Sequence, residues 1–590
     1  MIEVTPKVSR ALWQYGLLAG CLAILVVFLV YPILLTIRGG FASDPARGSG
    51  FTLEHVLRVF KDPETRTWLF NSLTLATSTT ILATVISLPL AVLAARYRFP
   101  GKSIFQAAIL VPMILPPFVG AIGLRMIVGR EGALNALLDS VHLSGVIESL
   151  LGQRLDLLAQ AKGLGVVLVQ SLSLYPIIFL NASASLANID PAMDEAAENL
   201  GAGFFRRFFT ITLPLMRPGL FAGGTIVFIW SFTELGTPLM FDYYRVIPVQ
   251  IFNKLKEVES SAQPYALTVV MLGCAILLYS LGKLVFGRAG YAMQTRAARA
   301  ASEERLEGTK GLLAAGVFVA VFALAILPHV GVILTSLARP GQWHKSMVPT
   351  AFTLSHYREA LASGDSFGAI VNSLKLSLVA MVLDIAIGIV VAYLLVRTRI
   401  IGRGLLDALC MLPLAVPGLV MAFGYVAMSL RWPFGQDGPL SAFAIFASDP
   451  NPFFFLIIAY GVRRLPYMVR STVAGLEQTS GELEEAAINL GATRTLAVRK
   501  VIIPLILANL IAGGLLVFSF SMLEVSDSLL LAQQTEDYPI TKAIWALTDR
   551  LGDGPHIASA LGVWGMALLT LTLFAASAAL GKKMGSIFRV

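Results

Sequence analysis

The sequence predicts an all-α polytopic membrane protein with twelve transmembrane helices, arranged as two parallel six-helix repeats. The 590 residues are 56% hydrophobic and only 14% charged, whereas soluble domains carry about 25% charged residues. Apolar runs near the ~20 residues needed to cross a bilayer recur along the whole chain. Polar and proline positions of the first half also return in the second half, which indicates an internal duplication.

The expected spans follow one another at short intervals. They cover residues 11–36, 70–95, 104–128, 164–187, 218–240, 264–286, 311–336, 370–396, 404–430, 452–474, 507–533 and 557–580. Pro and Gly inside them are compatible with helices in lipid, because neighbouring helices can satisfy the freed backbone groups. Arg463 and Arg464 interrupt the tenth span, which makes it the least typical of the twelve.

Basic residues near the span ends predict the orientation of the chain, since cytoplasmic loops carry an excess of Lys and Arg. With a cytoplasmic N-terminus, that side receives Arg96, Arg98, Lys102, Arg206, Arg207, Arg217, Arg288, Arg296, Arg299, Arg305, Lys310, Arg397, Arg399, Arg403, Arg494, Arg499, Lys500, Lys582, Lys583 and Arg589. The loop after the first span weakens the contrast, because it is also basic. The sum over all loops predicts that both termini are cytoplasmic. It also accounts for the net charge of +9 without a nucleic-acid partner.

The two halves repeat each other at fixed offsets. An offset of 290 pairs Glu195 with Glu485, Asn199 with Asn489, Gly201 with Gly491, Pro214 with Pro504, Pro176 with Pro466 and Glu234 with Glu524. An offset of 301 pairs Asn71 with Asn372, Pro112 with Pro413, Pro116 with Pro417 and Gly123 with Gly424. Six spans separate equivalent points, so the halves are expected to be parallel repeats about an axis along the membrane normal. The paired prolines are expected to kink the third and ninth helices.

These offsets divide the chain into three parts. Residues 1–293 form the first six-span half, residues 294–310 a charged cytoplasmic linker, and residues 311–590 the second six-span half. The offsets of 290 and 301 differ by 11 residues, which places an insertion in the loop 129–162 of the first half. The sequence leaves the role of that loop open.

Each half contains an acidic passage that predicts a short helix outside the membrane. In the first, Asp190 is a candidate N-cap and Gly201 a candidate stop. In the second, Thr479 and Glu482 form a possible capping box, and Gly491 is the stop. A helix of about ten residues is roughly 15 Å long and cannot cross a bilayer. In both copies a basic segment follows the glycine, so a compact knob on the cytoplasmic side is expected.

The passages share a spacing that ordinary solvated loops have no need to repeat: Glu-Ala-Ala, three residues, Gly, nine residues, an aliphatic, one residue, an aliphatic and Pro. The members are Glu195, Ala196, Ala197, Gly201, Ile211, Leu213 and Pro214, then Glu485, Ala486, Ala487, Gly491, Val501, Ile503 and Pro504. They resemble the EAA loop of bacterial ABC importer permeases of the binding-protein-dependent class. The EAA loops are here residues 188–214 and 478–504. The resemblance extends over the whole chain and is strongest to the double-length permeases of the ferric iron group.

That resemblance implies a location in the bacterial cytoplasmic (inner) membrane and a set of partners. The EAA helix would be a coupling helix, with Glu195, Ala196, Ala197, Gly201 and their second-half equivalents docking on a cytoplasmic ATPase. The fused chain would serve two copies of that ATPase, which bind ATP-Mg. A periplasmic or extracellular binding protein would deliver the solute. Alternating access between outward-open and inward-open states would carry it across.

The chain itself offers no energy source and no catalytic centre. It contains no G-x-x-x-x-G-K-[ST] phosphate loop and no soluble segment large enough for an ATPase domain. The six histidines show no metal-ligand spacing, and the three cysteines fall inside spans. We therefore expect no catalytic, cofactor-binding or metal-binding residues, and energy that comes from a partner. A gradient-driven secondary transporter is the alternative of another class.

Two acids inside the spans are candidates for the translocation pathway, because a charge in the bilayer is costly. Glu234 and Glu524 are equivalent, and they follow the equivalent serines Ser231 and Ser521. The pair could line a path for a cation, or it could hold packing near the mouth of the bundle. Asp384 and Asp527 have no acidic counterparts, so local packing or hydration is expected there.

The solute follows only from the resemblance. Ferric iron is the first expectation, with a phosphonate, thiamine, a polyamine or a sugar phosphate as alternatives in the same class of importer. Paired glutamates suit a cation, whereas a phosphonate would favour Arg or Lys facing the path.

Overall fold

The computed structural model describes residues 6–43, 49–114, 116–130, 132–151, 158, 162–187, 189–286, 304–343, 346–435, 437–446 and 450–580. The first half contains α1 (Pro6–Leu25), η1 (Val26–Val30), α2 (Tyr31–Phe41), α3 (Glu54–Lys61), α4 (Pro63–Arg96), β1 (Tyr97–Arg98), α5 (Lys102–Ala108), η2 (Val111–Met113), α6 (Pro117–Val128), α7 (Ala133–Ser140), α8 (Ser144–Leu151), α9 (Lys162–Ala187), α10 (Pro191–Asn199), α11 (Phe204–Arg207), η3 (Phe208–Thr212), α12 (Leu213–Thr233), α13 (Gly236–Met240), α14 (Ile247–Asn253), η4 (Leu255–Glu257) and α15 (Gln263–Phe286).

The second half follows a similar order of elements. It contains β2 (Glu304–Arg305), α16 (Gly308–Leu337), α17 (Ser355–Ala362), α18 (Gly364–Arg397), α19 (Arg403–Ala415), α20 (Gly418–Ser429), η6 (Ser441–Phe443), α21 (Phe453–Glu477), α22 (Glu482–Asn489), α23 (Arg494–Ala497), η7 (Val498–Ile502), α24 (Ile503–Leu505), α25 (Leu507–Met522), α26 (Ser526–Leu531), η8 (Thr535–Asp537), α27 (Ile540–Thr548) and α28 (Gly554–Leu580). η6 stands where the first half has α7 and α8, and β2 precedes the first long helix. β1 and β2 pair in parallel. Residues 294–303 of the expected linker, and most of the 152–161 part of the expected insertion, lie outside the described residues.

Eight helical segments of the described chain are long and apolar enough to cross a membrane, and eleven if each of three bent helix pairs counts as one. They match every expected span except the tenth, so the expected count of twelve is not confirmed. At the tenth position α21 is one continuous helix, but it carries Arg463, Arg464 and Arg470.

The third and ninth spans are broken where the paired prolines predicted a kink. The segment Lys102–Met113 meets the helix that begins at Pro117 at 97°, and Arg403–Ala415 meets Gly418–Ser429 at 104°. Pro116 and Pro417 are the N-cap residues of α6 and α20. The predicted kinks are therefore confirmed. Their cause is that each proline cannot continue the preceding helix and lies at the start of the next one.

The two halves interlock through these broken spans. α6 of the first half packs on α16 of the second, and α20 of the second half packs on α2 of the first. Both crossings need a glycine, because a Cβ on Gly123 would lie 2.2 Å from the Pro328 carbonyl oxygen, and one on Gly424 would lie 2.7 Å from that of Pro32. Gly123 and Gly424 are an equivalent pair, so the duplication preserved the contact.

One substitution tests this crossing. Gly331 lies opposite Gly123, and its added Cβ would lie 2.5 Å from the Gly123 carbonyl oxygen, whereas Gly316 of the same helix has nothing within 4 Å. We expect Gly331→Ala to lower the melting temperature of the purified protein. Gly316→Ala should leave it unchanged or raise it, because Ala favours a helix over Gly by about 1 kcal/mol. Equal melting temperatures for the two variants would contradict the close crossing.

The hydrophobic core consists of three clusters, two of which join residues of both halves. The largest buried cluster joins α13 and α15 of the first half to α20, α26 and α28 of the second. A second cluster joins Leu90, Ile178 and Met216 of the first half to Phe318 of α16, and a third, within the second half, includes Met468, Ile502 and Leu510. These two smaller clusters lie towards the ends of the long helices that lead into the EAA loops.

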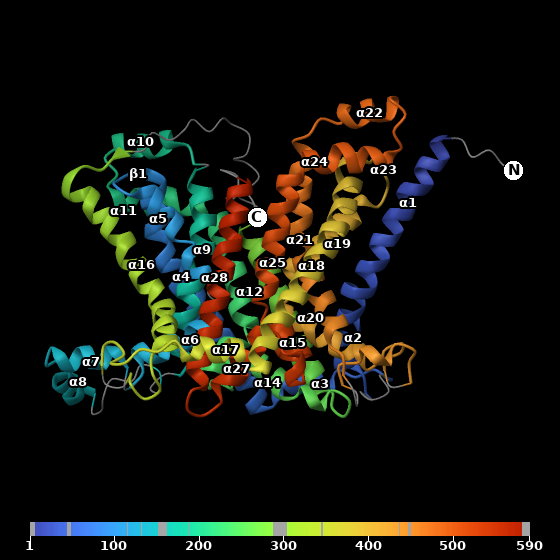
Figure 1. Ribbon diagram of the computed structural model, residues 1–590. Helices are drawn as coiled ribbons and strands as arrows, with labels where there is room; N and C mark the ends of the chain where they lie inside the picture. Colours follow the sequence, from blue (N-terminus) through green and yellow to red (C-terminus); the bar gives the residue numbers. More distant parts are fainter. Residues whose placement is uncertain are drawn as a thin grey trace.

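Both EAA helices lie on the same face of the molecule (Figure 1). This face, called the EAA face, carries α10 and α22 together with the start of α1. The opposite face carries the short helices α3, α7, α8, α14, α17 and α27. The six spans expected between equivalent points, an even number, predict this arrangement.

Candidate functional site: the EAA helices and a central cavity

The first EAA helix, α10, begins and ends where local signals predicted. Asp190 is its N-cap, and its side chain accepts a hydrogen bond from the Ala192 backbone N–H at 3.0 Å. Gly201 ends it with a left-handed φ of 82°. The N–H groups of Gly201 and Ala202 return to the carbonyls of Glu198 and Ala197, which is the Schellman arrangement. The helix is therefore a well-terminated unit of nine residues.

The second EAA helix, α22, ends in the same way but begins differently. Gly491 has a φ of 93°, and the Ala492 N–H returns to the Ala487 carbonyl. The expected capping box of Thr479 and Glu482 is wrong. Gly481 is the N-cap, and Ser480 Oγ accepts from the Glu482 N–H at 3.2 Å. Thr479 is instead bound by Arg397, as described below.

The residues expected to dock on a partner lie on the surface of these helices. Glu195 and Ala196, and equally Glu485 and Ala486, are exposed, and Ala197 and Ala487 are half-buried. Sequence reasoning missed the most exposed apolar side chain of each helix. Leu200 is 89% and Leu490 90% exposed. Because the two leucines are equivalent at the offset of 290, the repeat itself could have drawn attention to them.

The basic segment after the first glycine folds back on the acidic helix, as expected. Arg207 Nη1 lies 3.6 Å from Asp194 Oδ2 and also pairs with Glu198 Oε2. Arg206 points to solvent. The acidic and basic pieces of this EAA loop therefore form one ion-paired knob.

A cavity of about 220 Å³ lies between the two halves. Its walls come from α9 and α12 of the first half, α21 and α25 of the second, and both broken spans; they include Met113, Pro116, Pro117, Gln170, Ser173, Trp230, Glu234, Pro417, Gly418, Arg463, Arg464, Tyr467, Phe520, Leu523, Glu524 and Val525. The starts of α6 and α20 thus face it. Helix N-termini carry partial positive charge, so this end of the cavity is electropositive.

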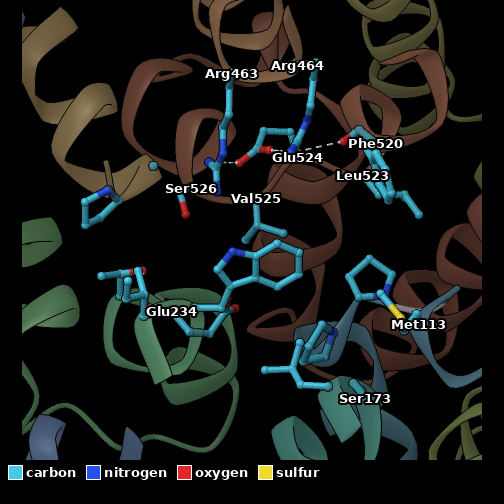
Figure 2. Close-up of a pocket in the computed structure, with 18 of the residues that line it drawn as sticks. Met113, Ser173, Glu234, Arg463, Arg464, Phe520, Leu523, Glu524, Val525 and Ser526 are labelled. Carbon is cyan, nitrogen blue, oxygen red and sulfur yellow. Dashed lines mark hydrogen bonds and ion pairs between the residues drawn. The ribbon is translucent and has the colours of Figure 1, made fainter. Parts of the chain in front are cut away.

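One wall holds a compact ion cluster. Arg463 Nη1 lies 2.5 Å from Glu524 Oε1, Arg464 Nη2 pairs with Glu524 Oε2, and Arg463 also lies 3.6 Å from Asp527. Figure 2 shows both guanidinium groups pointing to Glu524. The Glu524 side chain is 4% exposed, whereas that of Arg463 is 24% exposed. The cavity therefore meets guanidinium N–H groups more than carboxylate oxygens on this wall.

Gly418 makes room for this cluster. A Cβ added there would lie 2.0 Å from Arg463 Nη1. In the first half the equivalent residue is Pro117, and the residue equivalent to Arg463 is Ser173. Space for the guanidinium group is therefore a property of the second half alone.

Glu234 lies across the cavity from the cluster (Figure 2). It follows the last residue of α12, and its Oε1 accepts from the Thr237 N–H and the Thr237 hydroxyl, both at 3.3 Å. It is half-buried. The two glutamates expected in the pathway therefore line one cavity. Of these two, Glu524 is paired with arginine, and no ion pair of Glu234 is found within the described residues.

The equivalent serines do not line this cavity. Ser231 is buried, and its hydroxyl donates to Gln170 Oε1. Ser521 is fully buried. Within the described part of the chain, no three His, Cys, Asp or Glu side chains gather as metal ligands do. The cavity can hold a small solute and interact with it by charge.

Two arginines that line the cavity and two aspartates outside its lining occupy positions where the first half has uncharged residues. Arg463, Arg464, Asp384 and Asp527 stand where the first half has Ser173, Leu174, Ala83 and Thr237. The second half has therefore gained two positive and two negative side chains with no change in net charge. Sequence reasoning assigned the two aspartates to local packing or hydration and treated the arginines as an interruption of a span. The offset could have grouped all four, since each lacks a charged counterpart.

Comparison with known proteins places the duplication in context. A family model described as "Binding-protein-dependent transport system inner membrane component" matches the chain twice, at residues 87–291 and 384–585. The chain is 26% identical over 557 residues to the ferric transport system permease protein FbpB of Actinobacillus pleuropneumoniae, which covers 93% of this chain and 75% of that protein.

Two relatives come from Haemophilus influenzae. The putative ferric transport system permease protein FbpB 1 is 27% identical over 525 residues, covering 86% of this chain and 76% of that protein. The molybdenum transport system permease protein ModB is 34% identical over 221 residues, covering 36% of this chain and 91% of that protein. A protein less than half as long as this chain thus aligns with part of it.

Proposed function

This chain belongs to the family of binding-protein-dependent transport system inner membrane components, and from that premise we propose that it supplies both permease halves of one ATP-driven importer. Members of this family are multi-pass permeases of ABC importers in the inner membrane. The observation that carries the proposal is the pair of EAA helices on one face, each with the exposed Glu-Ala motif. Two such knobs suit two copies of a cytoplasmic ATPase.

The proposed topology has twelve spans with cytoplasmic termini. α21 is the tenth span, and its arginines are tolerable there because Arg463 and Arg464 face a cavity and pair with Glu524 rather than facing lipid. The EAA face is then cytoplasmic, and an extracytoplasmic binding protein would approach the opposite face.

The arrangement of the cores supports alternating access. The bundle of α4, α9 and α12 and the bundle of α18, α21 and α25 have separate cores nearer the EAA face, and α16 contributes Phe318 to the first of these cores. The largest core joins both halves. A molecule packed in this way can part towards the cytoplasm while it stays closed outside. We assign this conformation to the inward-facing state, with Glu234 and Glu524 on the wall of the pathway and Ser231 and Ser521 supporting it from behind.

Ferric iron is the first candidate for the solute. Two of the relatives above are named as ferric transport permeases and align over most of this chain. Carboxylate oxygens are suitable contacts for a hard cation. Glu234 is the carboxylate that can offer them directly, because both oxygens of Glu524 are occupied by arginine.

A small oxyanion is the second candidate. Arg463 and Arg464 face the cavity, and the N-termini of α6 and α20 lie beside it. A relative named as a molybdenum transport permease adds weight to this choice. The phosphonate alternative belongs to the same chemical class, and thiamine, polyamines and sugar phosphates remain less favoured.

Reconstitution tests the function and the solute together. Vesicles carrying the chain with a co-purifying ATPase are supplied with ferric ion, molybdate or a phosphonate through the binding protein. We expect ATP-dependent uptake that survives dissipation of ion gradients and is lost when Glu195→Lys and Glu485→Lys are combined. Uptake that follows an ion gradient and ignores ATP would instead identify a secondary transporter.

A further inference from the structure

Each EAA helix is tied to the end of a long membrane helix by an arginine. Arg96 is the last residue of α4, and its Nη1 lies 3.0 Å from Asp194 Oδ2 in the first turn of α10. Its other terminal nitrogen donates to the Thr212 hydroxyl of η3. The Arg96 and Asp194 side chains are only 21% and 20% exposed. One guanidinium group therefore joins α4, α10 and the start of the next span.

The second half contains the same tie in different surroundings. Arg397 is the last residue of α18, and its Nε lies 4.0 Å from Glu484 Oε2 in the first turn of α22. Its Nη2 donates to the carbonyl and the hydroxyl of Thr479, both at 2.8 Å. Tyr393, also on α18, donates to Glu484 Oε1 at 2.7 Å. Glu484 is buried, its hydrogen bond to α18 comes from Tyr393, and Arg397 is hydrogen-bonded to Thr479 just before α22.

Comparing the two halves shows which residues of this contact are kept at equivalent positions and which are not. Arg96 and Arg397 are equivalent at the offset of 301, and Asp194 and Glu484 at the offset of 290. The supporting residues are not maintained, since Thr212, Arg207 and Val92 correspond to Ile502, Ala497 and Tyr393. The arginine at the helix end and the acid in the EAA helix are the shared part.

α4 and α18 are also tied at a second point, nine residues after the first residue of each helix and towards the opposite face. Ser72 Oγ accepts from the Ile247 N–H at 2.9 Å, and Ser373 Oγ accepts from the Ile540 N–H at 2.8 Å. Ile247 and Ile540 are the first residues of α14 and α27. The neighbouring asparagines are also equivalent: Asn71 donates to the Arg245 carbonyl and Asn372 to the Glu536 carbonyl. In each half, the serine and the asparagine together are called the far joint.

The two joints of each helix are about 24 residues apart, or roughly 36 Å at 1.5 Å per residue. Between them, α4 packs along α9 and α12, and α18 packs along α21 and α25. Those four helices form the cavity walls. A rigid helix held at two points along its length can transmit a displacement from one point to the other.

We propose that α4 and α18 are paired rods that carry the movement of the EAA helices to the opposite face. Arg96 with Asp194 and Arg397 with Glu484 are the near joints, and the serine–asparagine pairs are the far joints. The arginines act as positioning residues, because they hold the EAA helices to the rods. This inference rests on the proposed function, which supplies the force at the EAA face.

A distance measurement across the opposite face tests the rods without knowledge of the solute. Spin labels are placed at Tyr244→Cys and Leu551→Cys, both exposed beyond α13 and α27, in a chain whose native cysteines are replaced. The chain is assembled with its ATPase, and the label distance is measured with and without ATP. In the parent chain we expect an ATP-dependent shift.

The near joints are then opened by combining Arg96→Gln with Arg397→Gln. We expect the ATPase to stay bound and to hydrolyse ATP while the shift is lost. The matched control combines Arg98→Gln with Arg399→Gln, an equivalent pair of exposed arginines two residues further along the chain. The control should keep the full shift. Exchanging the charges, with Arg96→Asp and Asp194→Arg in one half and Arg397→Glu and Glu484→Arg in the other, should restore at least part of it.

The far joints provide an independent second variant. Ser72→Ala combined with Ser373→Ala should reduce the shift while leaving the EAA face untouched, which also decides the matter if the glutamine variants fail to assemble. A full shift in the far-joint variant, or in near-joint variants that still assemble, would overturn the proposal that α4 and α18 carry the movement. The absence of any shift in a parent chain that couples ATP to uptake would also overturn it. A parent chain that recruits no ATPase would overturn the proposed function instead.

Discussion

Replacing both Leu200 and Leu490 by aspartate is expected to lower ATP-dependent uptake at least about 100-fold. Each side chain is about nine-tenths exposed in the isolated chain, and burying a leucine fully contributes about 1.5–3 kcal/mol. Two such contacts would contribute roughly 3–6 kcal/mol, and each 1.4 kcal/mol corresponds to about a tenfold change in affinity. The measurement is retention of the ATPase on the purified chain, together with uptake in vesicles.

Leu551 supplies the control for this prediction. It is 94% exposed, but it lies between α27 and α28 on the opposite face. Leu551→Asp should leave ATPase retention unchanged. Retention that survives the paired change at Leu200 and Leu490 would remove these leucines from the docking surface, whereas equal loss from all the variants would indicate general damage to the fold.

Local signals were enough to predict the EAA helices. A capping aspartate and a glycine with positive φ act within one helical turn, so α10 could be bounded from its own residues. The start of α22 was predicted wrongly because Thr479, the expected cap, is held by Arg397, a residue 82 positions away in the sequence. A tertiary contact removed the cap that local reasoning had assigned.

The long apolar spans were equally local, since each needs only composition and length. The prolines at the broken spans predicted the kinks. They did not predict that α6 and α20 would each cross the first span of the opposite half. That crossing depends on glycines whose role appears only when Gly123 is set against Pro328. Packing between distant segments is what the sequence alone leaves undetermined.

The central cavity shows the same limit. Glu234 and Glu524 could be paired from the repeat, and both do line one cavity. Their different environments could not be foreseen, because the partners of Glu524 lie about 60 positions earlier on α21. Arg463 and Arg464 looked like defects in a span until that helix was set against α25. Their charge is tolerated because it is paired and faces the cavity.

Replacing Arg463 and Arg464 by the residues at the equivalent first-half positions, Ser173 and Leu174, is expected to destabilise the second half by several kcal/mol. In the Arg463→Ser, Arg464→Leu variant, Glu524 stays buried at 4% exposure without its counter-ions, and breaking a buried pair by removing one side costs about 3–5 kcal/mol. We expect a large fall in the melting temperature of the purified protein. Arg470→Leu, on the same helix, is the control, because its pair with Asp407 is half exposed and should contribute less than about 1 kcal/mol.

The first half indicates how to repair that variant. Adding Asp384→Ala and Asp527→Thr returns the net charge to its original value and gives Glu524 the threonine neighbour that Thr237 provides for Glu234. We therefore expect the fourfold variant to melt well above the twofold one, although it removes four charged side chains instead of two. A fourfold variant no more stable than the twofold one would mean that the two aspartates do not balance the arginines. A twofold variant as mild as Arg470→Leu would mean that Glu524 does not need them.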